Sequence, residues 1–186
     1  MKIAHLFFLF SSILLLAACK DDDTALPAGS TLLKYDGGNA SGPILDAGNH
    51  EFAVRFPAST LASLVGKKLT EVQVFVGNVP PKRCIIKLYS AGNASNPGSL
   101  FYEKDVSSFL KLLQWNKFSV SQEITGEDLW VAVFVELDTR QQSIGCDSGP
   151  RQTNGDWLYS ESDQLWRTYE ERTSESVNWN IRALIQ

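Results

Sequence analysis

The sequence predicts an all-β protein, an antiparallel β-sandwich that is jelly-roll-like and has at most one short helix. Two observations indicate this class. Apolar and polar residues alternate with a period of two over several short stretches, and clusters of Gly, Asn, Asp and Pro such as "DGGNASGP" and "GNASNPG" separate them. Such alternation buries one face of a strand and leaves the other in water. Many short strands joined by turns are typical of sandwiches.

Individual strands follow from the alternation. Four stretches place their apolar residues on one face, namely residues 52–56, 72–76, 84–88 and 177–185. The run "LWVAVFV" over residues 129–135 is apolar on both faces and rich in β-branched and aromatic residues. It therefore predicts a central strand that is covered on both sides.

One short helix is expected around residues 58–65. Leu61, Leu64 and Val65 fall on one face of such a helix, and Gly66 is a typical residue at a helix end. The chain shows no internal repeat and no change of composition, which predicts a single sandwich domain.

The N-terminus predicts export. Lys2 precedes an apolar run that ends in two alanines, the pattern of a secretory signal peptide. A transmembrane anchor is the alternative, but it needs about 20 apolar residues. The segment Leu16-Ala17-Ala18-Cys19 resembles the lipobox of bacterial lipoproteins, which implies that Cys19 is lipidated and that residues 1–18 are removed. Removal of these 18 residues leaves 168 of the 186.

We expect residues 19–30 to form a tether and residues 31–186 the domain. Within the tether, Lys20 to Asp23 resembles the export signal of Bacteroidota lipoproteins, which implies the outer face of the outer membrane. A solvated linker is the alternative. Without Lys2 the formal charge is −5 rather than −4, and no basic block occurs. Nucleic acid is therefore not an expected partner, and the lipid alone would provide membrane contact.

Two cysteines remain after lipidation of Cys19, namely Cys84 and Cys146. An even pair in an exported protein is compatible with a disulfide. Buried free thiols are the alternative, since Cys84 alternates with apolar residues that face the core. Both interpretations are open at this stage.

The sequence contains no recognisable catalytic motif. His50 is the only histidine after the signal peptide, and no serine lies in a nucleophile elbow. Two pairs of acidic residues, Glu103/Asp105 and Glu161/Asp163, have the one-residue spacing that places two carboxylates on one face of a strand. Neither pair extends to a longer acidic motif, and the second lies in an expected turn. A sandwich glycosidase is therefore the least favoured function, and no cofactor is expected.

The segment "DWLYSESDQLWRTY" predicts a hairpin with an aromatic surface. Trp157, Tyr159, Trp166 and Arg167 are its candidate ligand contacts, because aromatic rings stack on sugars and polar neighbours bond hydroxyl groups. Core packing is the alternative, favoured for Trp166 and Trp179 and evenly balanced for Trp157 and Tyr159.

Acidic turns indicate a weak candidate for a structural calcium site. Asp147, Asp46 and the segment 36–39 offer oxygen ligands of the type that calcium prefers. Asp and Asn are equally common as turn residues, so a turn is the alternative.

A resemblance extends over residues 31–186. The segments "KYDGG", "CIIKLY", "WNKFSV", "DLWVAV", "CDSGP" and "NWNIRALI", in this order, resemble the β-sandwich modules of Bacteroidota surface lipoproteins and of cleaved-adhesin-type domains. The resemblance implies a module for adhesion or ligand binding. The expected function is a lipid-anchored surface module that binds a glycan or a host glycoprotein. An accessory subunit of a surface protein complex is the alternative.

Overall fold

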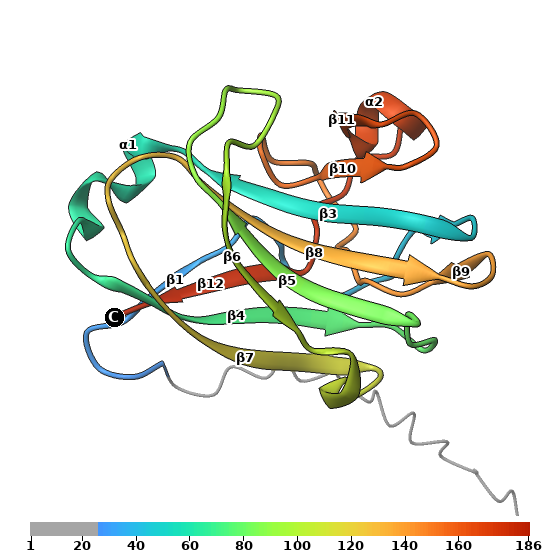
Figure 1. Cartoon of the computed structure of the whole chain (residues 1–186), viewed down its shortest axis with the longest axis horizontal. Helices are drawn as coiled ribbons and strands as arrows, with labels where there is room; N and C mark the ends of the chain where they lie inside the picture. The colour runs from blue at the N-terminus through green and yellow to red at the C-terminus, as the bar shows by residue number, and fades with distance from the viewer. Residues whose placement is uncertain (1–25) are drawn as a thin grey trace, which may run out of the picture.

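The structure, a computed structural model, describes residues 26–186 as two antiparallel sheets that enclose one core (Figure 1). The four-stranded sheet has the order β1-β12-β4-β7 and the six-stranded sheet the order β11-β10-β3-β8-β5-β6, while β2 and β9 form a small ribbon. From β3 to β5 and from β6 to β8 the chain passes repeatedly between the sheets, as in jelly rolls. The predicted all-β sandwich is confirmed.

The strands range from two residues in β2 to ten in β7, so several are longer than the short strands that the turn residues predict. Their bounds are β1 Thr31–Leu33, β2 Ile44–Leu45, β3 Gly48–Phe56, β4 Lys68–Val76, β5 Arg83–Tyr89, β6 Leu100–Asp105, β7 Gln114–Glu123, β8 Leu129–Leu137, β9 Gln141–Gln142, β10 Trp157–Ser160, β11 Leu165–Thr168 and β12 Ile181–Ile185. Helical turns are α1 Ala58–Leu61, η1 Ala62–Leu64, η2 Ser107–Phe109 and α2 Tyr169–Thr173.

The central position of β8 is confirmed, since β8 pairs with β3 on one side and with β5 on the other. The helix expected around residues 58–65 is present as α1 followed by η1. The five-residue α2 was not expected. Its start is fixed by a capping box in which Thr168 and Glu171 exchange side-chain and backbone hydrogen bonds.

The core lies between the sheets and collects the inward residues of the alternating strands. Its largest fully buried members include Trp179, Phe52, Phe56, Leu61, Leu69, Ile86, Leu88, Ile144, Ile181 and Ile185. The core residues of the described segment run from Leu33 to Ile185. None of the helices in this segment is long and apolar enough to cross a membrane.

Trp179 joins the two sheets. Its ring meets Phe52 of β3 at 5.1 Å between centroids and Tyr169 of α2 also at 5.1 Å. The indole Nε1–H donates to the carbonyl oxygen of Trp157 at 2.8 Å. The side chain is fully buried, which confirms the core position expected for Trp179.

Cys84 and Cys146 are separate, buried free thiols, so the disulfide alternative is not the one that the structure adopts. Cys84 faces the core from β5, as its alternation predicts, and Cys146 makes backbone bridges to Ser41 and Trp179. Burial raises the pKa of each thiol to about 12, and the nearby carboxylates of Asp105 and Asp147 add to the effect. Neither thiol forms the reactive thiolate at neutral pH.

We predict that both thiols of residues 26–186 react with a thiol reagent after unfolding without reductant and that neither reacts rapidly in the native protein. Burial and the raised pKa both suppress the reaction in the folded state. A spectrophotometric thiol assay with and without denaturant measures the two rates. Fewer than two reactive thiols in the unfolded chain would contradict the structure.

Candidate functional site

The aromatic hairpin forms as predicted and sorts its residues onto two faces. β10 and β11 pair with Tyr159 opposite Trp166, and residues 161–164 make the turn. Trp157, Tyr159 and Trp166 share the outer face of the six-stranded sheet. Arg167 lies opposite Leu158 and therefore belongs to the other face. The structure thus brings together three of the four expected ligand contacts and separates the fourth.

These rings mainly pack on one another. Trp157 covers Ala53 of β3 and Ala132 of β8 together with Trp130, whose ring centroid lies 5.3 Å away. Trp157 is only 8% exposed, so it is a packing residue rather than a ligand contact.

Tyr159 and Trp166 keep part of their surface accessible. Their ring centroids lie 5.7 Å apart, and Trp166 lies 5.9 Å from Trp130. The outer aromatic cluster (Trp130, Trp157, Tyr159 and Trp166) is therefore a set of rings in mutual contact, of which Tyr159 and Trp166 are partly exposed.

The calcium interpretation of Asp147 does not fit the structure. The carboxylate of Asp147 accepts four N–H groups, from the backbone of Gly37, Gly149 and Asn178 and from the Asn178 side chain, at 2.7–3.0 Å. Asp36 is buried against Arg182 at 2.6 Å. Both acidic groups therefore stabilise turns, and no group of three metal-ligating side chains forms among residues 26–186.

The paired carboxylates also have structural partners. The turn expected for Glu161 and Asp163 is confirmed, and Asp163 binds Arg172 at 2.8 Å. Asp105 on β6 binds Arg83 at 3.1 Å, and both side chains are exposed. These contacts occupy one carboxylate of each pair at the surface.

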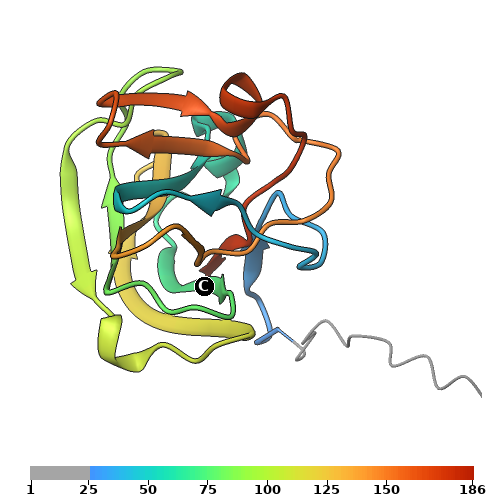
Figure 2. The same cartoon turned by 90° about the vertical axis from the view of Figure 1, so that its right-hand side faces the viewer.

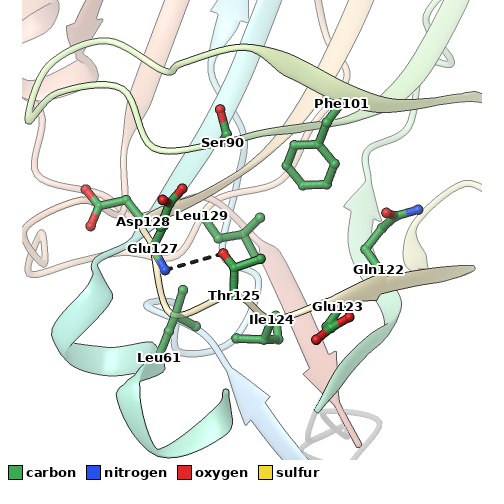
Figure 3. Close-up of a pocket in the computed structure, with 10 residues that line it drawn as sticks. All are labelled: Leu61, Ser90, Phe101, Gln122, Glu123, Ile124, Thr125, Glu127, Asp128 and Leu129. Atoms are coloured by element: carbon green, nitrogen blue, oxygen red, sulfur yellow. Dashed lines mark hydrogen bonds between the residues drawn. The ribbon is translucent and has the colours of Figure 1, made fainter. Parts of the chain in front are cut away.

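A groove opens where the edge strands β6 and β7 approach the connection to β8, and we call it the Phe101 groove (Figure 3). Its volume is about 340 Å³. The floor is apolar and consists of Leu61 from α1 with Ile124 and Leu129. The ring of Phe101 points from β6 over this floor and is 47% exposed.

Polar side chains frame the groove on two sides. Figure 3 shows Glu127 and Asp128 on one side and Gln122 and Glu123 on the other. Glu123 and Glu127 are exposed and face solvent at the rim. An apolar floor, one exposed ring and a rim of carboxylates and an amide match the usual composition of a small-ligand site.

Asp128 fixes the shape of the groove. Its carboxylate accepts from Arg55 at 2.6 Å and from the Ala58 backbone N–H at 2.8 Å, which ties the β7–β8 connection to the start of α1. Burial opposes ionisation of Asp128. The two sets of hydrogen bonds outweigh burial, so the pKa of this carboxyl is below its ordinary value.

Sequence reasoning did not find the groove. Its lining comes from four segments that lie far apart in the chain, around residues 61, 90, 101 and 122–129. The one local signal is Phe101, an aromatic residue that is exposed on the edge strand β6. No family model, curated protein or solved structure matches the chain.

We predict that Asp128→Asn lowers the free energy of unfolding by about 1–3 kcal/mol at about pH 7, because it weakens the bonds to Arg55 and Ala58. A carboxyl group whose pKa is lower in the folded than in the unfolded state stabilises the folded protein. This contribution is fully present at pH values above the unfolded-state pKa of about 3.9. This stability is lost as the pH falls through the lower folded-state pKa.

The difference in the free energy of unfolding between wild type and Asp128→Asn should therefore be smaller at about pH 3 than at about pH 7. Urea denaturation at both pH values measures it. Asp138→Asn is the matched control, since the Asp138 side chain is 67% exposed. An Asp128→Asn effect that is equal at both pH values would contradict the role of the ionised carboxylate.

Proposed function

We propose that this protein is a lipid-anchored cell-surface module that binds a glycan and that the Phe101 groove is its binding site. One observation carries the proposal: an exposed ring stands over an apolar floor and beside carboxylate and amide groups. The apolar face of a sugar ring stacks on an aromatic side chain, and its hydroxyl groups bond to the polar rim. The groove holds one or two sugar units at most, by its volume of about 340 Å³.

The surface location of this module rests on the N-terminal sequence. Cys19 and the acidic tract after it lie outside the described residues, and their pattern resembles a lipobox followed by an outer-face export signal. The first described residues lead into β1, which forms the outer edge of the four-stranded sheet. A tether at a sheet edge leaves the Phe101 groove, on the β6 and β7 side, accessible to ligands.

A second candidate function is contact with a protein partner in a surface complex. One observation favours it: Phe109 and Leu113 are 67% and 68% exposed and lie in the connection between β6 and β7. Leu112 beside them is 39% exposed. Neighbouring apolar side chains of this exposure are common at protein interfaces. Leu113 also has a positive φ of 56°, so the backbone holds this side chain in a conformation that leucine rarely adopts.

We predict that Phe101→Ala weakens glycan binding by about tenfold, the loss expected from one stacking interaction. A glycan array probed with residues 26–186 identifies the sugar, and calorimetry on the best glycan measures the affinity. Phe109→Ala is the matched control, because it removes an exposed ring of the same kind outside the groove.

Equal affinity of Phe101→Ala and wild type would overturn the assignment of the groove. If the array gives no glycan at all, the protein-contact function is favoured. In that case cross-linking on whole cells should depend on Phe109 and Leu113 and not on Phe101.

We further predict that Cys19→Ala releases the full chain from membranes or leaves its signal peptide uncut, because lipidation requires the thiol of Cys19. Membrane fractionation and the mass of the processed chain measure the two effects. Cys84→Ala is the control, since that thiol is buried in the domain. Unchanged processing and partitioning in Cys19→Ala would contradict the lipid anchor.

A further inference from the structure

A second pocket lies at the opposite end of the six-stranded sheet, and we call it the His50 pocket. β3 runs from Gly48 to Phe56. The end of β3 at Phe56 leads into α1, which lines the Phe101 groove. The first residues of β3 line the His50 pocket. β10, β11 and α2 lie together along one edge of the sheet (Figures 1 and 2), and β10, the turn after it and α2 contribute the other wall. The volume is about 420 Å³.

The imidazole of His50 has one nitrogen without a partner. Nε2 lies 2.9 Å from the main-chain carbonyl oxygen of Asp46. A carbonyl oxygen only accepts, so Nε2 carries the hydrogen, and Nδ1 of the neutral ring presents a lone pair. Nδ1 is buried and has no hydrogen-bond partner in the structure, and the residue is only 7% exposed. A buried acceptor without a donor is costly unless a ligand or a water supplies one.

Arg172 of α2 has the complementary group. Its terminal nitrogens bind the Asp163 carboxylate at 2.8 and 3.2 Å and the carbonyl oxygens of Leu165 and Leu158 at 2.7 and 3.3 Å. These bonds fix the guanidinium group. Its Nε–H is buried and has no partner. His50 and Arg172 both line the pocket, and each has one buried polar atom, an acceptor and a donor respectively, that nothing in the described protein satisfies.

The remaining lining favours a neutral polar ligand. Ser160 lies directly opposite His50 in the β3–β10 ladder, and its hydroxyl bonds to that of Ser162 at 2.9 Å. Leu158 and Tyr169 supply buried apolar surface. Among the charged lining residues, Arg172 pairs with Asp163 and Asp46 pairs with Arg140, while Glu161 adds a further negative charge. An anionic ligand would meet net negative charge here.

We propose that the His50 pocket is a second binding site, specific for a neutral hydroxylated ligand such as a sugar ring or a polyol. A hydroxyl group both donates and accepts, so it satisfies His50 Nδ1 and the Arg172 Nε–H without a change of protonation. The serine hydroxyls can rotate to bond a second hydroxyl of the ligand. This proposal is independent of the Phe101 groove, since no residue lines both sites.

The test uses the fact that His50 is the only histidine of residues 26–186. Selective ¹⁵N labelling of histidine then gives one imidazole, whose two nitrogens are observed by long-range ¹H–¹⁵N NMR. The probes are neutral methyl glycosides of galactose, glucose, mannose and fucose, together with glycerol and sodium acetate. We expect Nδ1 of the free protein to show the shift of an unprotonated nitrogen and to move upfield with at least one hydroxylated probe.

Glycerol separates the two sources of hydroxyl groups: a response to glycerol indicates a polyol site, and a response to glycosides alone indicates a sugar site. His50→Phe keeps a planar ring and should weaken binding of the responding probe by about tenfold, by ligand-observed NMR. Phe101→Ala is the control and should leave the response of Nδ1 unchanged. No response to any hydroxylated probe, or a response to acetate alone, would overturn the proposal.

Discussion

Trp179 is the contact on which the arrangement of this sandwich depends. Its ring fills the space between Phe52 of the six-stranded sheet and Tyr169 of α2, and its Nε1–H bonds to the backbone of β10. Because Trp179 lies two residues before β12 of the four-stranded sheet, one side chain fixes both sheets and the helix. A smaller residue here would leave a cavity at the junction of three elements, the costliest kind of core change.

The two ends of β3 give the molecule two different chemical environments. At the end that precedes α1, the Asp128–Arg55 pair holds a groove in which the hydrogen-bonding groups lie at the rim. At the other end, His50 and Arg172 line a pocket, and each has a buried polar atom without a partner in the described protein. The two proposals therefore differ in their chemistry: ring stacking is the proposed main interaction in the first site and directional hydrogen bonds are in the second.

Alternation and turn residues predicted most of the fold, because both are local properties. The burial of Trp179 and Cys84 followed from their positions in alternating stretches. The short helix α2 was overlooked, although Thr168 and Glu171 have the spacing of a capping box. The two sites could not be predicted, because their residues meet only through sheet pairing: His50 faces Ser160 across a ladder that joins residues more than a hundred positions apart. The burial of Trp157 depends in the same way on Trp130 of another strand.

The β10–β11 hairpin contributes to both faces of its sheet at once. Trp157 and Tyr159 point to the outer aromatic cluster, and the intervening Leu158 and the following Ser160 point to the His50 pocket. A shift of the pairing by one residue would exchange these two sets, because side chains alternate along a strand. The turn over residues 161–164 is constrained as well, because Ser162 bonds to Ser160 and Asp163 binds Arg172. A single insertion within either strand would at once bury serine among tryptophans and place indole rings in the pocket.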